Sequence, residues 1–233
     1  MPRYLEIRNA RKRVRMGGLK GTPRTKKAAV IVAHPDDEVL WAGGTILSRP
    51  QWQWEIYVLC RASDPDRAPR FLRTLRKLEA DGAIGDLDDG PDQSPLDLAV
   101  VRTAIVSLLP HRRFNLVLTH GLRGEYTRHR RHEETCRAVV QLWSRGVIET
   151  DEVWMFAYED SDGQQLPVAL RKADRYEPLP TQVWERKHCL ITEYYGFAPG
   201  SWEAQATSRA EAFWCFDTPQ AAQAWLELHG DPR

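Results

Sequence analysis

Apolar runs of strand length recur along the chain and are separated by stretches with helical periodicity. The apolar runs predict strands at 28–33, 55–60, 114–119 and 152–157. The stretches between them predict helices at 38–47, 70–83, 98–109 and 133–143. Because strands and helices alternate, the sequence predicts an α/β fold of three layers, with a mostly parallel sheet covered by helices on both faces.

The pattern loosens from Gly163 onward, where prolines become frequent. There we expect short strands and an excursion that shapes the pocket wall, followed by a helix near 219–228. A length of 233 residues suits one large α/β domain. We expect this domain to span 27–233, with 163–233 as a variable region that shapes the substrate pocket.

Positive charge is concentrated before the first strong strand. The net charge of the whole chain is only +1, but within residues 1–26 a single acid, Glu6, opposes many arginines and lysines. Such a segment is typical of a solvated, flexible arm, so we expect a basic N-terminal arm and no nucleic-acid binding. The sequence shows no apolar stretch long enough to span a membrane and no signal peptide, which predicts a cytoplasmic protein.

The four cysteines are scattered and lack the C-x-x-C spacing of thiolate clusters. They predict reduced thiols and neither a disulfide framework nor a cysteine zinc site. The positions are Cys60, Cys136, Cys189 and Cys215.

One histidine and three carboxylates follow the first predicted strand directly, in the segment Ala-His-Pro-Asp-Asp-Glu at 33–38. Crowded carboxylates repel one another and lose hydration, so a strand end tolerates them mainly where a cation or a substrate compensates their charge. Open α/β sheets also bind ligands beyond the carboxyl ends of their strands. A metal site is therefore the first hypothesis. The alternative is the solvated first turn of a helix, whose dipole favours negative charge.

Two further histidines, His129 and His132, lie three residues apart where the loop after the third predicted strand enters a helix. At this spacing they can face the same way. With His34 and Asp37 they provide the mixed imidazole and carboxylate set that suits zinc and leaves one position open for water. The alternative is a solvent-facing turn in which the histidines accompany the neighbouring arginines.

The segment 33–38 after a first strand, with Gly124-Glu125-Tyr126 and the two later histidines, resembles the LmbE/PIG-L family of metal-dependent N-acetylglucosaminyl deacetylases. The resemblance extends from Lys27 to Val140. It implies a Rossmann-like fold, one zinc ion per chain, and hydrolytic removal of an acetyl group from a small N-acetylated amino sugar.

The resemblance also implies roles for single residues. The zinc ligands are expected at His34, Asp37 and His132. A general base is expected at Asp36, and a protonated His129 is expected to stabilise the transition state.

Substrate contacts are implied in the same way. Family members hold sugar hydroxyls with an arginine and an aspartate from segments after the second strand, and the candidates here are Arg70 or Arg73, and Asp89. Tyr126 is a further substrate-binding candidate, although it precedes His129 by three residues where the family commonly has two. A second departure is the pair Arg130-Arg131, which stands where the family commonly has Pro-Asp.

Two other functions stay open. Histidine and aspartate metal sites also cleave phosphate esters, and Arg128, Arg130 and Arg131 would suit an anionic substrate. The second alternative function is that of a catalytically inactive, sugar-binding relative, although the complete histidine and aspartate set argues against it. A homo-oligomer, and another divalent metal in place of zinc, are both compatible with the sequence.

Overall fold

A mixed sheet of eight strands, with order β1-β4-β3-β2-β5-β6-β10-β9, forms the middle layer of the protein. The computed structural model describes residues 5–7 and 25–230. All neighbours from β4 to β6 pair in parallel, while β1, β10 and β9 pair antiparallel. The strands are β1 (Leu5–Ile7), β2 (Lys27–Val32), β3 (Gln53–Val58), β4 (Asp81–Ile84), β5 (Arg113–Thr119), β6 (Glu149–Phe156), β9 (Arg175–Pro178) and β10 (Ala210–Phe216), besides a separate pair of β7 (Tyr158–Glu159) and β8 (Val168–Ala169).

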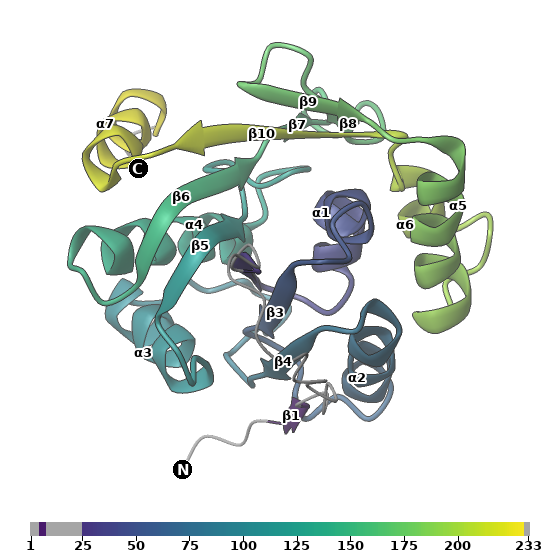
Figure 1. Ribbon diagram of the computed structural model, residues 1–233, viewed down its shortest axis with the longest axis horizontal. Helices are drawn as coiled ribbons and strands as arrows, with labels where there is room; N and C mark the ends of the chain where they lie inside the picture. Colours follow the sequence, from purple (N-terminus) through teal and green to yellow (C-terminus); the bar gives the residue numbers. More distant parts are fainter. Residues whose placement is uncertain (1–4, 8–24, 231–233) are drawn as a thin grey trace, which may run out of the picture.

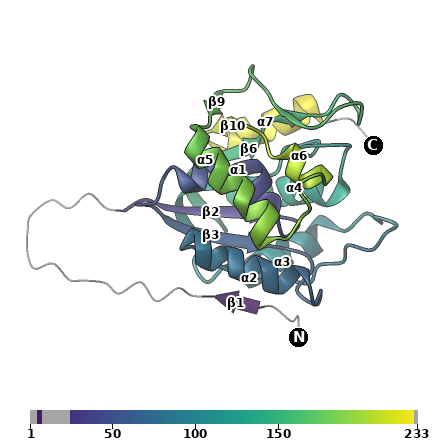
Figure 2. The same ribbon diagram turned by 90° about the vertical axis from the view of Figure 1, so that its right-hand side faces the viewer.

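Helices cover both faces of the sheet, as the sequence predicts (Figure 1). Along β2, Ala28, Val30 and Val32 join the apolar cluster under α1 and α2, while Ala29 and Ile31 join the cluster under α3, α4 and α7. Figure 2 shows α5 packed on the outside of α1. The helices are α1 (Asp37–Leu47), α2 (Arg67–Leu78), α3 (Leu98–Leu108), α4 (Arg130–Ser144), α5 (Thr181–Cys189), the π-helical η1 (Leu190–Tyr194), α6 (Trp202–Ala206) and α7 (Pro219–His229).

Successive strands are added first on one side of β2 and then on its other side. From β2 the chain steps to β3 and β4 through α1 and α2 on one face, and then crosses by α3 on the other face to β5, on the opposite side of β2. A crevice at the carboxyl ends of β2 and β5 is therefore the expected ligand site of this topology. The segment 33–38 follows β2, and the loop with the later histidines follows β5.

The expected helix at 70–83 is wrong at both ends. The helix starts at Arg67 and stops at Leu78, because Glu79 takes a left-handed φ of 54°. The strand β4 follows, and its Gly82 lies so close to β3 that a Cβ would meet the Ile56 carbonyl oxygen at 2.1 Å. A four-residue strand with one glycine carries too little periodicity to be recognised in a sequence.

The ends of the chain agree only in part with the expectation. The final helix is confirmed as α7, with Pro219 in its first turn and the Thr218 hydroxyl capping it. The strand β1 lies within the expected N-terminal arm, and most of the arm's basic residues lie in 1–4 and 8–24, outside the described residues. No helix of the described part is long and apolar enough to cross a membrane.

A buried ion pair ties α1 to the last third of the chain. Lys187 of α5 and Glu211 of β10 are both fully buried, and their Nζ and Oε1 atoms lie 2.7 Å apart. The same carboxylate accepts the backbone N–H groups of Gly44 and Thr45 in α1, each at 2.7 Å. Glu211 thus fixes α1, which carries the acidic segment at its other end.

We predict that Lys187→Met lowers the free energy of unfolding by about 3–5 kcal/mol, because it leaves the Glu211 charge buried and unpaired. The double variant Lys187→Met/Glu211→Gln removes that charge and should recover much of the loss. Urea denaturation of the three proteins measures both effects. A single variant as stable as the parent protein would contradict this account of α1.

Candidate metal centre and catalytic cavity

A cavity of about 470 Å³ opens at the carboxyl edge of the sheet. The loops after β2, β3, β4 and β5 contribute to it together with α1, α2 and α6. The lining residues are His34, Pro35, Asp36, Asp37, Leu40, Arg61, Asp64, Arg67, Asp89, Tyr126, His129, Trp202 and Glu203. Polar ends of four successive parallel strands therefore converge on one rim.

Three side-chain atoms at the base of this cavity have the spacing of zinc ligands. The Nδ1 atom of His34 lies 3.1 Å from Nε2 of His132 and 3.3 Å from Oδ2 of Asp37. Nε2 of His132 and Oδ2 of Asp37 lie 3.4 Å apart. Ligands about 2.0–2.1 Å from a tetrahedral zinc ion lie roughly 3.3 Å from one another. The expected ligand set is therefore brought together with a geometry that fits zinc.

Asp37 opens α1 and is almost completely buried. Its Oδ1 atom accepts the indole N–H of Trp41 at 3.0 Å, and its Oδ2 atom accepts the backbone N–H of His34 at 2.8 Å. Burial works against its charge, but the imidazoles of His132 and His120 hold the pKa of Asp37 well below its usual range. The carboxylate is therefore ionised and oriented before any cation binds.

Glu125 forms hydrogen bonds to two histidines of this cluster. Its Oε2 atom accepts the Nδ1 protons of His132 at 2.6 Å and of His120 at 2.9 Å. Burial opposes the charge, yet these two histidines lower the pKa of Glu125 to about 2. Because Nδ1 of His132 donates to a carboxylate, its Nε2 lone pair is directed to the metal position, which is the usual arrangement around a zinc-binding histidine.

His120 is a site residue that the sequence reasoning did not assign. Its Nε2 atom accepts the backbone N–H of Ala33 at 2.9 Å and lies 3.4 Å from Oδ2 of Asp37. The ring therefore fixes the start of the acidic segment against the loop after β5. Its place directly after Thr119, the last residue of β5, was the available signal.

Asp89 lines the cavity, as expected of a substrate ligand, but its carboxylate has several protein partners. Arg61 Nε donates to Oδ2 at 2.9 Å, and Gln93 Nε2 donates to Oδ1 at 2.8 Å. The Oδ1 atom also lies 3.2 Å from Nε2 of His34, on the side of the ring away from the metal position. This placement suits orientation of His34.

Asp36 lies beside the ligand set without belonging to it. Its φ of 110° is strained for a residue with a side chain, and strain of this kind is common at functional sites. Arg67 donates to its Oδ2 atom at 3.0 Å. Burial and the adjacent Asp37 charge raise the pKa of Asp36 well above its usual range, which makes its carboxylate a stronger proton acceptor.

Glu38 does not line the cavity; it is buried in the core and contacts the backbone of Asp36. Its Oε2 atom accepts the backbone N–H of Asp36 at 3.1 Å, and its Oε1 atom accepts the hydroxyl of Tyr195 at 2.5 Å. Burial raises the pKa of Glu38 to about 7. The three consecutive acids thus have three different environments.

His129 stands at the entrance of α4, with its ring 4.5 Å from that of His132 and 4.7 Å from that of His34. Burial, together with the charges of those two histidines, lowers the pKa of His129 to about 3. The ring is therefore neutral at pH 7, which does not support the expectation of a protonated His129. Its buried Nδ1 atom has no hydrogen-bond partner among the described residues.

The expected arginines lie outside the cavity. Arg70 and Arg73 of α2 donate to the backbone carbonyls of Tyr195 and Tyr194, respectively. One turn earlier, Arg67 lines the cavity instead, because the helix begins before the predicted start. Among the sequence-predicted substrate contacts, only Asp89 and Tyr126 lie in the cavity.

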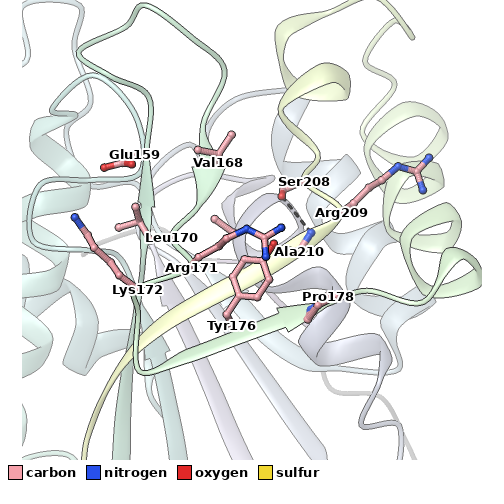
Figure 3. A pocket seen from close by; sticks show the side chains of 11 residues that line it. Glu159, Val168, Leu170, Arg171, Lys172, Tyr176, Pro178, Ser208, Arg209 and Ala210 are labelled. Atoms are coloured by element: carbon pink, nitrogen blue, oxygen red, sulfur yellow. Dashed lines mark hydrogen bonds between the residues drawn. The ribbon is translucent and has the colours of Figure 1, made fainter.

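A second, larger cavity of about 690 Å³ lies over β8, β9 and β10 (Figure 3). Arg171, Lys172 and Tyr176 are among its lining residues, with the Arg171 guanidinium 5.0 Å from the Tyr176 ring. It contains neither a histidine nor a cysteine, and Glu159 is its only carboxylate among the described residues. The candidate metal-binding side chains therefore belong to the smaller cavity.

Fold and site together define an α/β protein with a histidine and carboxylate cluster at the switch point of a Rossmann-like sheet. Residues 29–143 match the family model described as PIG-L, GlcNAc-PI de-N-acetylase. This match, over about half of the chain, confirms the resemblance drawn from its motifs. Its match to an uncharacterised protein of Acanthamoeba polyphaga mimivirus has 23% identity over 194 residues, covering 77% of this chain and 80% of the viral protein.

Solved structures share the fold at low sequence identity. The N,N'-diacetylchitobiose deacetylase of Pyrococcus horikoshii is 16% identical with a TM-score of 0.60, covering 83% of this chain and 85% of that one. A mutant deacetylase of the teicoplanin pathway is 15% identical with a TM-score of 0.58, covering 82% and 98%. The 4-carboxy-2-hydroxymuconate hydratase of Pseudomonas putida is 17% identical with a TM-score of 0.57, covering 82% and 96%. Since a hydratase shares the fold, the fold alone does not select the reaction.

We predict that Glu125→Gln weakens zinc binding roughly 10–100-fold, because the amide removes the carboxylate charge between the two histidines. Its NH2 group would also face the backbone N–H of Gly121, which Oε1 of Glu125 accepts at 2.7 Å. Competition with a chromogenic chelator measures the affinity. Glu149→Gln, which alters an exposed pair with Arg113, is the matched control. Equal affinities of the two variants would show that Glu125 does not orient the ligands.

Proposed function

We propose that this protein is a zinc-dependent hydrolase that removes the acetyl group from an N-acetylated amino sugar. The observation that carries the proposal is the near-tetrahedral spacing of His34, Asp37 and His132 next to a carboxylate, Asp36, that lies outside the ligand set. The family match over residues 29–143 supports the same reaction class.

His34, Asp37 and His132 would hold the metal. A zinc ion bound there supplies a Lewis acid for the amide carbonyl and lowers the pKa of water toward neutrality. Glu125 and Asp89 keep the two histidine ligands oriented from outside. The rest of the reaction depends on side chains of the cavity.

Asp36 is the proposed general base. It accepts a proton from the attacking water and passes it to the departing nitrogen, so that the products are acetate and a free amine. The Arg67 guanidinium fixes the orientation of the carboxylate through Oδ2. The raised pKa of Asp36 makes its carboxylate a stronger acceptor for the proton of the attacking water.

His129 is the proposed donor to the oxygen that becomes negative during attack. As a neutral imidazole it retains one N–H group for this purpose. A single donor at such a position typically contributes about 3 kcal/mol, or roughly a hundredfold in rate. Tyr126 packs with its ring 5.9 Å from that of His129 and borders the same cavity.

A phosphoesterase has weaker support. Arg131 is buried and donates to Glu134 and to the backbone carbonyls of Asp88 and Ser94, so it cannot bind a phosphate in the cavity. Neither Arg128 nor Arg130 lines the cavity. The arginines that suggested an anionic substrate thus lie elsewhere.

The proposal is tested by elemental analysis of protein purified without added metal, together with acetate release from a panel of N-acetylated amino sugars. About one zinc per chain with acetate release is the expected result. Failure to bind or take up any divalent metal would overturn the proposal. Bound zinc with no acetate from any sugar would reject the deacetylase assignment while leaving the metal site intact.

We predict that Asp36→Ala retains zinc and loses most turnover, at least a hundredfold in kcat, since it removes the base but no ligand. In contrast, His132→Ala should lose zinc as well as activity. Metal content and kcat of the two variants are measured side by side. Equal loss of metal in both would refute the division between base and ligand.

A further inference from the structure

An exposed tryptophan stands at the mouth of the catalytic cavity. Trp202 of α6 is 38% exposed, and it is the only aromatic residue among the exposed large hydrophobic side chains of the described residues. By contrast, Trp41, Trp54 and Trp154 are at most 5% exposed. An indole kept in contact with water beside an active site is unusual for a residue that only fills a core.

The position of Trp202 is fixed by its surroundings. The Ser201 hydroxyl caps α6 by accepting the N–H of Ala204, and Ala204 and Ala206 are buried beneath the helix. The indole ring lies 4.6 Å from the ring of Tyr126, which in turn lies 5.5 Å from that of His132. A series of rings thus leads from the metal ligands to an exposed aromatic face.

Polar side chains that can bind hydroxyl groups surround this face. Glu203 adjoins Trp202, and Asp64 and Arg61 line the same cavity. A rigid aromatic surface combined with a few carboxylate and guanidinium groups is complementary to a pyranose ring, which has an apolar C–H face and a rim of hydroxyls. An acyclic amide would use the polar groups but not the indole.

We propose that Trp202 is the stacking platform for the pyranose ring of the substrate and makes the enzyme selective for cyclic amino sugars. This inference rests on the proposed deacetylase function and adds a residue to its specificity. Trp202 lies outside the segment 29–143 that carries the family match. The selectivity therefore comes from the last third of the chain.

A purely structural role for Trp202, as a support for Tyr126 and its loop, makes a different prediction. Loss of such a support would impair ring-containing and acyclic substrates alike, because the disturbed loop carries His129. Loss of a platform would impair only ligands with a pyranose ring. The two roles are therefore separable by substrate.

The first measurement is calorimetric titration of the zinc-loaded protein with D-glucosamine, which has no acetyl group to lose. Trp202→Ala should weaken its binding about tenfold, as expected for the loss of one aromatic stack, while Trp202→Phe should retain part of the affinity. Trp52→Ala is the matched control, because Trp52 is a partly exposed tryptophan stacked on Trp54 at the amino end of the sheet. An unchanged affinity in Trp202→Ala, an equal loss in the control, or no binding of glucosamine to the parent protein would each overturn the proposal.

The second measurement compares kcat/KM for the methyl glycoside of N-acetylglucosamine with that for N-acetylethanolamine. In Trp202→Ala the ratio of the two should fall about tenfold, mainly through the KM of the glycoside. A parallel loss on both substrates would show that Trp202 supports the loop. If neither substrate releases acetate, the proposed function fails, and the glucosamine titration still decides whether Trp202 binds a sugar.

Discussion

Three consecutive buried or half-buried acids at the end of β2 impose the constraint on which the rest of the site depends. Each would be costly to ionise in isolation, and together they also repel one another. The protein gives each a different partner: the histidine cluster for Asp37, Arg67 for Asp36 and the Tyr195 hydroxyl for Glu38. As a result the three acids differ in proton affinity, which is what the proposed roles of Asp37 as a metal ligand and Asp36 as a base require.

These partners come from distant parts of the chain. Tyr195 follows η1, and the Lys187–Glu211 pair fixes the carboxyl-terminal part of α1. The last third of the protein therefore contributes to the cavity wall and also fixes the position of α1, the helix that begins with Asp37. This dependence is consistent with a single domain, although the family match stops at residue 143.

The parts of the fold that were predictable from sequence are those with strong local patterns. The apolar run of β2 and the two histidines at the start of α4 could be recognised from local sequence, because each lies at or next to the end of a regular element. The short strands β4 and β1 were not predicted, because they are defined by pairing with neighbouring strands and carry no clear periodicity of their own. Arg67, and not Arg70 or Arg73, lines the cavity because α2 begins at Arg67. The lowered pKa of His129 results from burial and from the neighbouring histidines. Neither property is encoded in a local pattern.

Arg131 illustrates how a departure from a family pattern can be accommodated. It lies between His129 and His132 in the sequence, but its side chain is buried and donates to the backbone carbonyls of Asp88 and Ser94. These contacts hold the loop that carries Asp89, and Asp89 lies against His34. The arginine thus connects the helix that carries His132 with the loop that contacts His34. A change that looked like an added charge for substrate binding is better explained as a structural link behind the histidine and carboxylate cluster.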